Sequence, residues 1–171
     1  IAYLVSQQQS DGGLPGFSGT SDVGTSALGL LALGLGGFDL ESMSTVTGTS
    51  LADYVVSNAI TYTHAITGTG SEYLYPGRAG VVLTGMAAVS PSVADQGFGK
   101  SYEEFWRVWQ HNLLPQLQDT YDSATGTYAT TAQEGYTSGA ASVSNQAWSI
   151  LGISSWGYVV PVAATNWLIG Q

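Results

Sequence analysis

The stretch that decides the fold of this 171-residue chain is Asp22-Val-Gly-Thr-Ser-Ala-Leu-Gly-Leu-Leu-Ala-Leu-Gly-Leu-Gly-Gly37. Asp22 is of a type that caps helix N-termini, and Gly37 is of the type that most often ends helices. The residues between them are apolar or small on every side of a helix, and such a helix is buried all round. The stretch therefore predicts a core helix.

The same pattern returns without gaps as Ser142-Val-Ser-Asn-Gln-Ala-Trp-Ser-Ile-Leu-Gly-Ile-Ser-Ser-Trp-Gly157, in which Val143 matches Val23. Residues 78–89 are a third candidate copy, whose register the sequence leaves open. The recurrence distance of roughly 50–60 residues lies just beyond the periods of about 20–50 residues that mark repeat proteins. We therefore expect an array of repeated units.

A second kind of segment alternates with these core helices. Each member combines an aromatic residue, two aliphatic residues, a small residue and an amide: Tyr3–Gln7, Tyr54–Asn58 and Trp167–Gln171, with a looser member at Leu113–Gln118. Their polar stripe predicts outer helices with one face in water. The alternation predicts an all-α, two-layer array that forms a single domain over residues 1–171.

Polar, turn-rich segments connect outer to inner helices, as in residues 9–17 and 122–128. Glycine allows positive φ there, and we expect the aromatic residues Phe17 and Tyr128 to fold back over the helix ends. The chain opens at Ile1 inside an apolar run and stops at Gln171 in a helical one. We therefore expect it to be a piece of a longer protein.

The composition narrows the function. Three Lys and Arg against twelve Asp and Glu give a net charge of -9, which argues against nucleic acid as a partner. The absence of Cys removes thiol nucleophiles and thiolate metal sites. No stretch reaches the roughly 18 apolar residues of a membrane span. With only 9% charged residues, the surface is of a kind commoner outside the cell, so we predict an extracellular or cell-surface protein.

Residues 8–13, Gln-Gln-Ser-Asp-Gly-Gly, lead through Ser21-Asp22 into Thr25-Ser-Ala-Leu-Gly-Leu-Leu-Ala-Leu-Gly. This succession resembles the prenyltransferase and squalene-oxidase type repeat. The resemblance implies the α/α toroid of the terpenoid cyclase and protein prenyltransferase superfamily, which also includes thioester domains and cobalamin carriers. The helices expected here fill only part of a ring, so it implies an incomplete toroid of about seven helices.

The activities of that superfamily can be compared with the residues present. Squalene cyclase-type enzymes protonate their substrate with an Asp-x-Asp-Asp motif, and the nearest pair here, Asp119 and Asp122, lacks the third carboxylate. Prenyltransferases need an Asp/Cys/His zinc site and thioester domains need a Cys, which this chain does not have. We therefore expect a non-catalytic bacterial module, a scaffold or small-ligand-binding domain without metal or cofactor.

An enzyme remains the alternative: a terpenoid-cyclase-like or glycan-active protein whose catalytic acid lies outside this chain. Glycoside hydrolysis needs two carboxylates about 5–10 Å apart. Four acidic residues lie near the expected starts of inner helices and could gather at one mouth: Asp22, Glu72, Asp95 and Glu134. Each also has a structural explanation, because acids stabilise helix N-termini.

We expect any ligand, hydrophobic or glycan-like, between the inner helices near Asp22, Arg78, Glu134 and Trp148. Arg78 precedes an inner helix and could bind an anion or pair with Glu72. Trp148 could present its ring to a ligand, although the repeat register favours packing for the tryptophans.

His64 and His111 stand alone on expected helices, which argues against a metal role. The matching end segments could meet head to tail in a homodimer that completes the ring.

Overall fold

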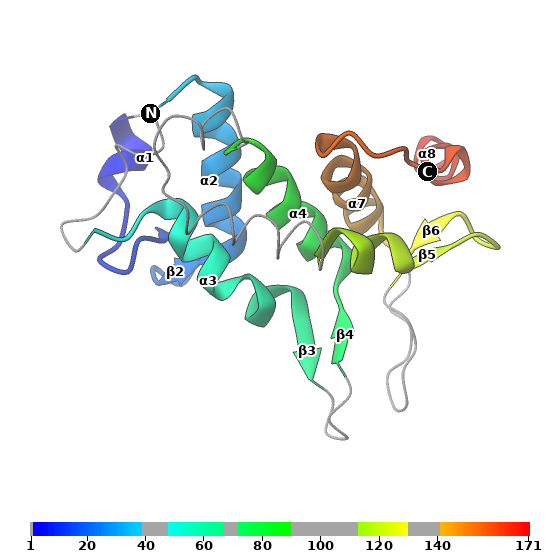
Figure 1. Ribbon diagram of the computed structural model, residues 1–171, viewed down its shortest axis with the longest axis horizontal. Coiled ribbons are helices and arrows are strands. Elements are labelled where there is room, and N and C mark those ends of the chain that lie inside the picture. Colours follow the sequence, from blue (N-terminus) through cyan, green and yellow to red (C-terminus); the bar gives the residue numbers. More distant parts are fainter. Residues whose placement is uncertain (1, 39–47, 67–71, 90–112, 130–140) are drawn as a thin grey trace.

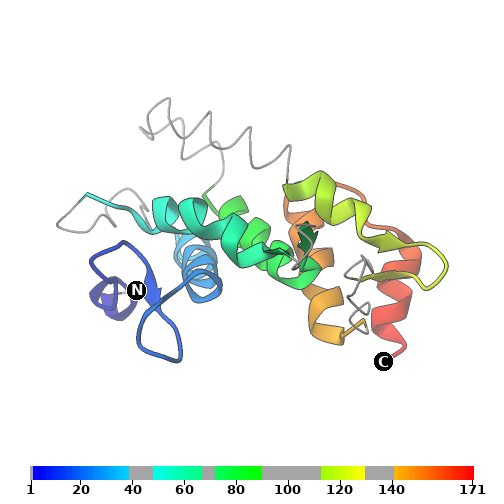
Figure 2. The same ribbon diagram turned by 90° about the horizontal axis from the view of Figure 1, so that it is seen from below.

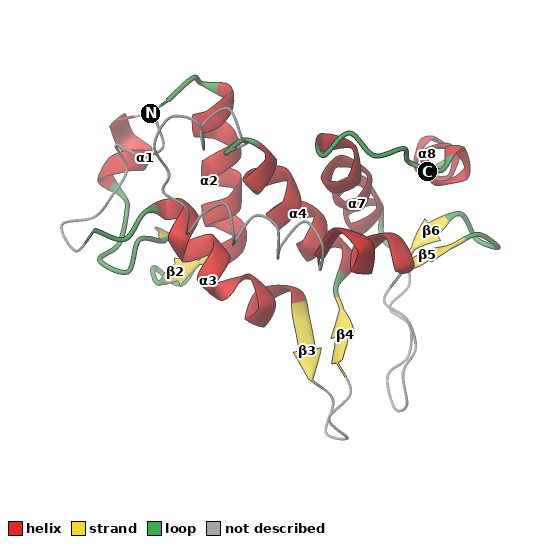
Figure 3. Ribbon diagram, in the orientation of Figure 1, coloured by secondary structure: helices red, strands yellow, loops and turns green. Residues whose placement is uncertain are grey.

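The computed structural model describes residues 2–38, 48–66, 72–89, 113–129 and 141–171, which are mostly helical (Figures 1 and 3). The helices are α1 (Ala2–Ser6), α2 (Val23–Leu35), α3 (Leu51–Thr63), α4 (Pro76–Ala87), α7 (Val143–Ser155) and α8 (Val162–Ile169). Residues 113–119 are also helical. The all-α class is thus confirmed at a coarse level.

Three antiparallel hairpins supplement the helices. They pair β1 (Leu14–Pro15) with β2 (Ser21–Asp22), β3 (His64–Ile66) with β4 (Glu72–Leu74), and β5 (Tyr121–Asp122) with β6 (Thr127–Tyr128). Each hairpin comes after an outer helical segment and before an inner helix in the chain. The sequence predicted turns at these places but not the strand pairing.

The inner helices α2, α4 and α7 form a row with α4 in the middle, while α1 and α8 lie at opposite ends of the molecule (Figures 1 and 2). The start of α4 meets the start of α7 where Gly77 touches Asn145. Further along, the indole Nε1 of Trp156 donates to the carbonyl oxygen of Leu83 at 3.0 Å. These two contacts, in the same order along both helices, make α4 and α7 parallel.

Glycines bring the inner helices into backbone contact. A Cβ on Gly80 would collide with the backbone of Trp148, and one on Gly85 would collide with the carbonyl of Ala27. Glycine is therefore required on both sides of α4. This close approach explains why the copies of the inner helix carry so many small residues.

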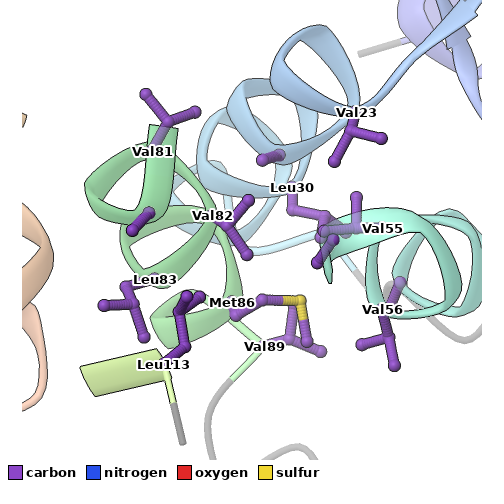
Figure 4. Packing of buried hydrophobic residues seen from close by; sticks show 14 of the residues in the cluster. Val23, Leu30, Val55, Val56, Val81, Val82, Leu83, Met86, Val89 and Leu113 are labelled. Carbon is purple, nitrogen blue, oxygen red and sulfur yellow. The ribbon is translucent and has the colours of Figure 1, made fainter. Parts of the chain in front are cut away.

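The hydrophobic core lies between α2, α3 and α4, with Leu113 adding to it from residues 113–119 (Figure 4). Its central side chains include Leu30, Val55, Val82 and Met86. In α3 the buried residues alternate with an exposed stripe that contains Ser57 and Thr61, as the sequence predicted for an outer helix. None of the described helices is both long and apolar enough to cross a membrane.

The repeat is visible in the caps of α2 and α7, each of thirteen residues. Asp22 accepts a hydrogen bond from the Thr25 backbone N–H, as predicted, and Ser142 accepts one from that of Asn145. At the other end, Gly37 and Gly157 have φ values of +68° and +76°. The gap-free match of the two stretches therefore corresponds to matched helices.

Two expectations about burial were wrong. Every residue of α4 except Arg78 and Ala87 is buried. The two end helices of the row are not buried all round as predicted: α2 exposes Leu28 and Leu35, and α7 exposes Val143 and Leu151, because each has an inner helix on only one side among the described residues. In the hairpins, Tyr128 of β6 is buried as expected, whereas Phe17 is fully exposed in the loop between β1 and β2. Leu14 takes the buried position in that hairpin.

Candidate functional site

Asp22 and Arg78, two of the predicted ligand-binding residues, lie at the same end of the helix row, and Tyr62 lies between them. Asp22 is the N-cap of α2, Arg78 is the third residue of α4, and Tyr62 lies in the last turn of α3. Because α3 runs antiparallel to its neighbours, its C-terminal end meets their N-terminal ends. We call Asp22, Tyr62, Tyr75 and Arg78 the mouth cluster.

Tyr62 lies between the two charged residues. Its hydroxyl oxygen packs against Gly24, where a Cβ would stand only 2.5 Å from it, so glycine is needed for this approach to the start of α2. Burial raises the pKa of Tyr62, the charge of Asp22 raises it further, and Arg78 lowers it. The pKa of Tyr62 therefore responds to both charges, and its side chain stays a neutral phenol at physiological pH.

Arg78 is fixed by aromatic rings. Its guanidinium carbon lies 4.4 Å from the centroid of Tyr75 and 5.2 Å from that of Tyr62. Its Nη1 donates to the carbonyl oxygen of Tyr62 at 3.1 Å, which satisfies one of the acceptors left without an intrahelical partner at the end of α3. Arg78 thus lies inside α4, not before it as predicted.

The position of Arg78 is electrostatically unfavourable by itself. A cation in the first turn of a helix opposes the helix dipole, at a cost of roughly 0.3–1 kcal/mol. Contacts with two tyrosine rings offset this, since each cation–π contact contributes about 0.5–1 kcal/mol at an exposed site. The predicted ion pair with Glu72 involves a side chain outside those described. Arg78 is held in place by aromatic contacts and one carbonyl.

The mouth cluster has hydrogen-bonding capacity to spare. Oδ1 of Asp22 accepts from both the backbone N–H and the hydroxyl of Thr25, at 2.7 and 2.8 Å. Within the described part of the chain, Oδ2 of Asp22, the hydroxyl of Tyr62 and the remaining N–H groups of Arg78 have no partner. An acceptor, a phenol and a set of charged donors therefore remain available at one end of the row.

A second carboxylate reinforces the negative side of the cluster. Asp11 accepts from the hydroxyl of Ser21 at 2.6 Å and from the N–H of Gly13 at 3.1 Å, so it is tied to the β1–β2 hairpin. Burial raises the pKa of Tyr54, and the charges of Asp11 and Asp22 raise it further. The hairpin thus holds both carboxylates on the α2 side of the mouth.

Of the other two predicted residues, only Trp148 is described, and it does not join this cluster. Trp148 is half-buried on α7, packs against the hydrophobic core and has its backbone against Gly80, which fits the packing interpretation. Glu134 lies outside the described residues. Sequence reasoning missed Tyr62 and Tyr75. The spacing of Tyr75 three residues before Arg78 is a usable signal on a helix, whereas Tyr62 is found only from the fold.

No group of three His, Cys, Asp or Glu side chains that could hold a metal is found in the described part of the chain. His64 begins β3 instead of standing on a helix as predicted. Its Nδ1 shares a hydrogen bond with the Thr63 hydroxyl and its Nε2 another with Oε1 of Gln116, both at 2.9 Å. His111 lies outside the described residues.

Asp122 makes an Asx turn. Its carboxylate accepts from the N–H of Ala124 and from the hydroxyl of Thr125, and these bonds lower its pKa. The carboxylate is therefore engaged in the turn of the β5–β6 hairpin.

Comparisons with known proteins found no family model, no curated protein and no solved structure that matches this chain. The mouth cluster must therefore be interpreted from its own chemistry.

Proposed function

We propose that this chain is an α/α-toroid repeat module that serves as a scaffold and binds a small glycan-like ligand at the mouth cluster. The toroid interpretation is supported by three successive units, each with an outer helical segment, a hairpin and an inner helix. It is also supported by the row of inner helices with α3 packed onto α2 and α4. The row corresponds to an open part of a ring.

One observation carries the binding role: Asp22, Tyr62 and Arg78 meet at one end of two neighbouring inner helices with unused hydrogen-bonding atoms. Ligand sites combine a few convergent polar groups of this kind with aromatic side chains. Hydroxyl groups of a sugar can donate to a carboxylate and accept from a guanidinium or a phenol. The polar character of the cluster favours a glycan-like ligand over a hydrophobic one.

The test is a titration of the full chain with a panel of mono- and oligosaccharides, followed by ligand-detected NMR. At least one member should bind, and Asp22→Asn should weaken that binding because the amide replaces an acceptor by a donor. Ser154→Ala, an exposed change on α7, is the matched control and should bind as the unchanged protein does. Absence of binding across the panel would contradict the proposal.

A catalytic role would also contradict it. Incubation with squalene, with polyprenyl diphosphates and with the same glycans, followed by product analysis, should leave all substrates unchanged. A cyclised, transferred or hydrolysed product would instead favour the terpenoid-cyclase-like or glycan-active alternative.

We further propose that the module belongs to an exported or surface bacterial protein and self-associates head to tail. The low charge content supports the location. The association is supported by apolar side chains exposed near both ends of the row, including Val159 and Val162 at α8 and Tyr3 on α1. Because α1 and α8 are copies of one outer element, a second copy could continue the array.

Sedimentation at rising protein concentration tests the association. A dimer should appear, and Val162→Asp should abolish it by placing a charge in the contact. A protein that remains monomeric at the highest concentration would exclude the homodimer.

A further inference from the structure

We infer that Arg78 is the carboxylate anchor of the mouth cluster and that the ligand class is an acidic saccharide, a sugar with one carboxylate and free hydroxyls. This inference rests on the proposed glycan-binding role and makes it more specific. Of the three basic residues in the chain, Arg78 is the one that the structure describes. Its surroundings distinguish a charged ligand from a neutral one.

The geometry of Arg78 suits a carboxylate. The contacts with Tyr62 and Tyr75 fix the plane of the guanidinium, and the bond from Nη1 to the Tyr62 carbonyl fixes its rotation. Arg78 is itself exposed, so its remaining N–H groups can reach a ligand. A planar guanidinium held in this way can donate two parallel hydrogen bonds to one carboxylate, an arrangement that a neutral hydroxyl cannot match.

The rings of Tyr62 and Tyr75 are already in contact with the guanidinium of Arg78. Arg78 covers a face of each ring, so those faces are not available for stacking against a sugar. A neutral sugar therefore cannot stack on these two faces. Recognition must come from the polar edge of the cluster, where a charge-assisted bond is about twice as strong as a neutral one.

The local charges limit the ligand to a single negative group. Arg78 contributes one positive charge, and no side chain caps the N-terminus of α4, although Asp22 caps α2 and Ser142 caps α7. On the other side of Tyr62, Asp22 would repel a second anionic group. Its free Oδ2 can instead accept a hydrogen bond from a sugar hydroxyl. One carboxylate toward Arg78 and hydroxyls toward Asp22 describe a uronic-acid unit.

A purely structural role for Arg78 is the alternative, since its bond to the Tyr62 carbonyl already caps α3. The experiment is calorimetric titration of the full chain with a galacturonate oligosaccharide and with the galactose oligosaccharide of the same length. We expect the galacturonate to bind about tenfold tighter, the difference typical of a charged against a neutral hydrogen-bond partner. Equal binding of the two, or binding of neither, would overturn the inference, whereas the proposed function would be contradicted only if the whole saccharide panel failed to bind.

Substitutions of Arg78 distinguish its proposed role as the carboxylate anchor from its role as the cap of α3. Arg78→Lys keeps the charge but loses the planar fork, so it should reduce the preference for galacturonate; Arg78→Gln should remove the preference altogether. Asp22→Asn should weaken both oligosaccharides to a similar degree. If Arg78→Gln kept the full preference, Arg78 would not be the anchor.

A second variant keeps the test valid should Arg78→Gln unfold. Tyr75→Leu removes the ring at 4.4 Å from the guanidinium but leaves the bond to Tyr62. It should lower galacturonate affinity severalfold and galactose affinity less, because the fixed orientation of Arg78 matters most for the carboxylate. A thermal melt monitored by circular dichroism establishes that each variant is folded. A galacturonate preference unaltered by Tyr75→Leu would contradict the aromatic positioning of Arg78.

Discussion

The two matched inner helices, α2 and α7, have the same backbone and different surroundings. Both are thirteen residues long, are capped at the same position and end at a glycine with positive φ. Val23 of α2 is nevertheless only 8% exposed, whereas its counterpart Val143 is 51% exposed. The repeat therefore encodes how the helix starts and stops, and its position in the row decides which faces are covered.

The comparison extends to the hairpins before these helices. The hydroxyl of Ser26 accepts the N–H of Leu14, and at the equivalent position Oε1 of Gln146 accepts the N–H of Tyr128, both at 2.9 Å. The longer Gln146 also donates to the carbonyls of Gly126 and Ala164. A link from inner helix to hairpin is thus present in both units, but it reaches the first strand of one hairpin and the second strand of the other.

The largest expected loss of stability comes from a substitution at the backbone contact between α4 and α7. Gly80→Ala places a Cβ against the backbone of Trp148, so the free energy of unfolding should fall by about 3 kcal/mol, the upper end of overpacking costs. Gly170→Ala, where the nearest atom would be 3.4 Å away, is the control and should change stability by less than about 0.5 kcal/mol. Urea denaturation measures both. Similar losses at the two sites would contradict backbone contact between α4 and α7.

The second prediction compares the losses of stability when the hydrogen bonds of Gln146 and of Ser26 to their hairpins are removed. Gln146→Ala removes three hydrogen bonds, to one N–H and two carbonyls, and should cost about 2–3 kcal/mol, whereas Ser26→Ala removes two, to the N–H of Leu14 and the carbonyl of Asp22, and should cost about 1–2 kcal/mol. Denaturation of both variants, with exposed Ser154→Ala as the control, gives the difference. Equal costs would mean that Gln146 gains nothing from its extra bonds.

The third effect concerns the caps. Asp22→Ala should cost about 1.5 kcal/mol and Ser142→Ala about 0.7 kcal/mol, within the range for lost N-caps. Asp22 should cost more because it also holds the hydroxyl of Thr25. Thermal unfolding of the two variants is the measurement, with Asp22→Asn expected to restore most of the loss. A greater cost at Ser142 than at Asp22 would contradict the contribution of the bond from the Thr25 hydroxyl.

The smallest effect at neutral pH comes from Tyr128 in the β5–β6 hairpin. Burial raises its pKa from 10.0 to about 12, with a further contribution from Tyr121. As pH rises through 10, the unfolded chain releases this proton first, so stability should fall between pH 10 and about 12 and be unaffected below. Tyr128→Phe should lose less stability across that window. An identical decline would exclude Tyr128 as the cause.

Local features of the fold could be predicted from the sequence because they depend on neighbouring residues. The Asp22 cap, the end of α2 at Gly37 and the Asx turn of Asp122 are all formed within a few positions. The hairpins could not be predicted, since strands of two or three residues leave no alternating pattern. The exposure of Val143 depends on which elements pack beside α7 in space, and the helix's own sequence does not contain that information.

The candidate site was predictable only in part. Asp22 and Arg78 were expected near each other because both belong to starts of inner helices. The residue between them, Tyr62, comes from the far end of an outer helix, and its approach depends on Gly24. Contacts between residues distant in the chain leave no spacing rule in the sequence.

The backbone contacts of α4 have a mechanical consequence. At Gly80 and Gly85 there is no side chain between helices to change rotamer and absorb a displacement. Tightly packed interiors are stiff, so α2, α4 and α7 should respond to force as one rigid plate. Any adjustment to a ligand is then left to side chains and hairpins, and a site built across such a plate is preorganised, with little entropy to lose on binding.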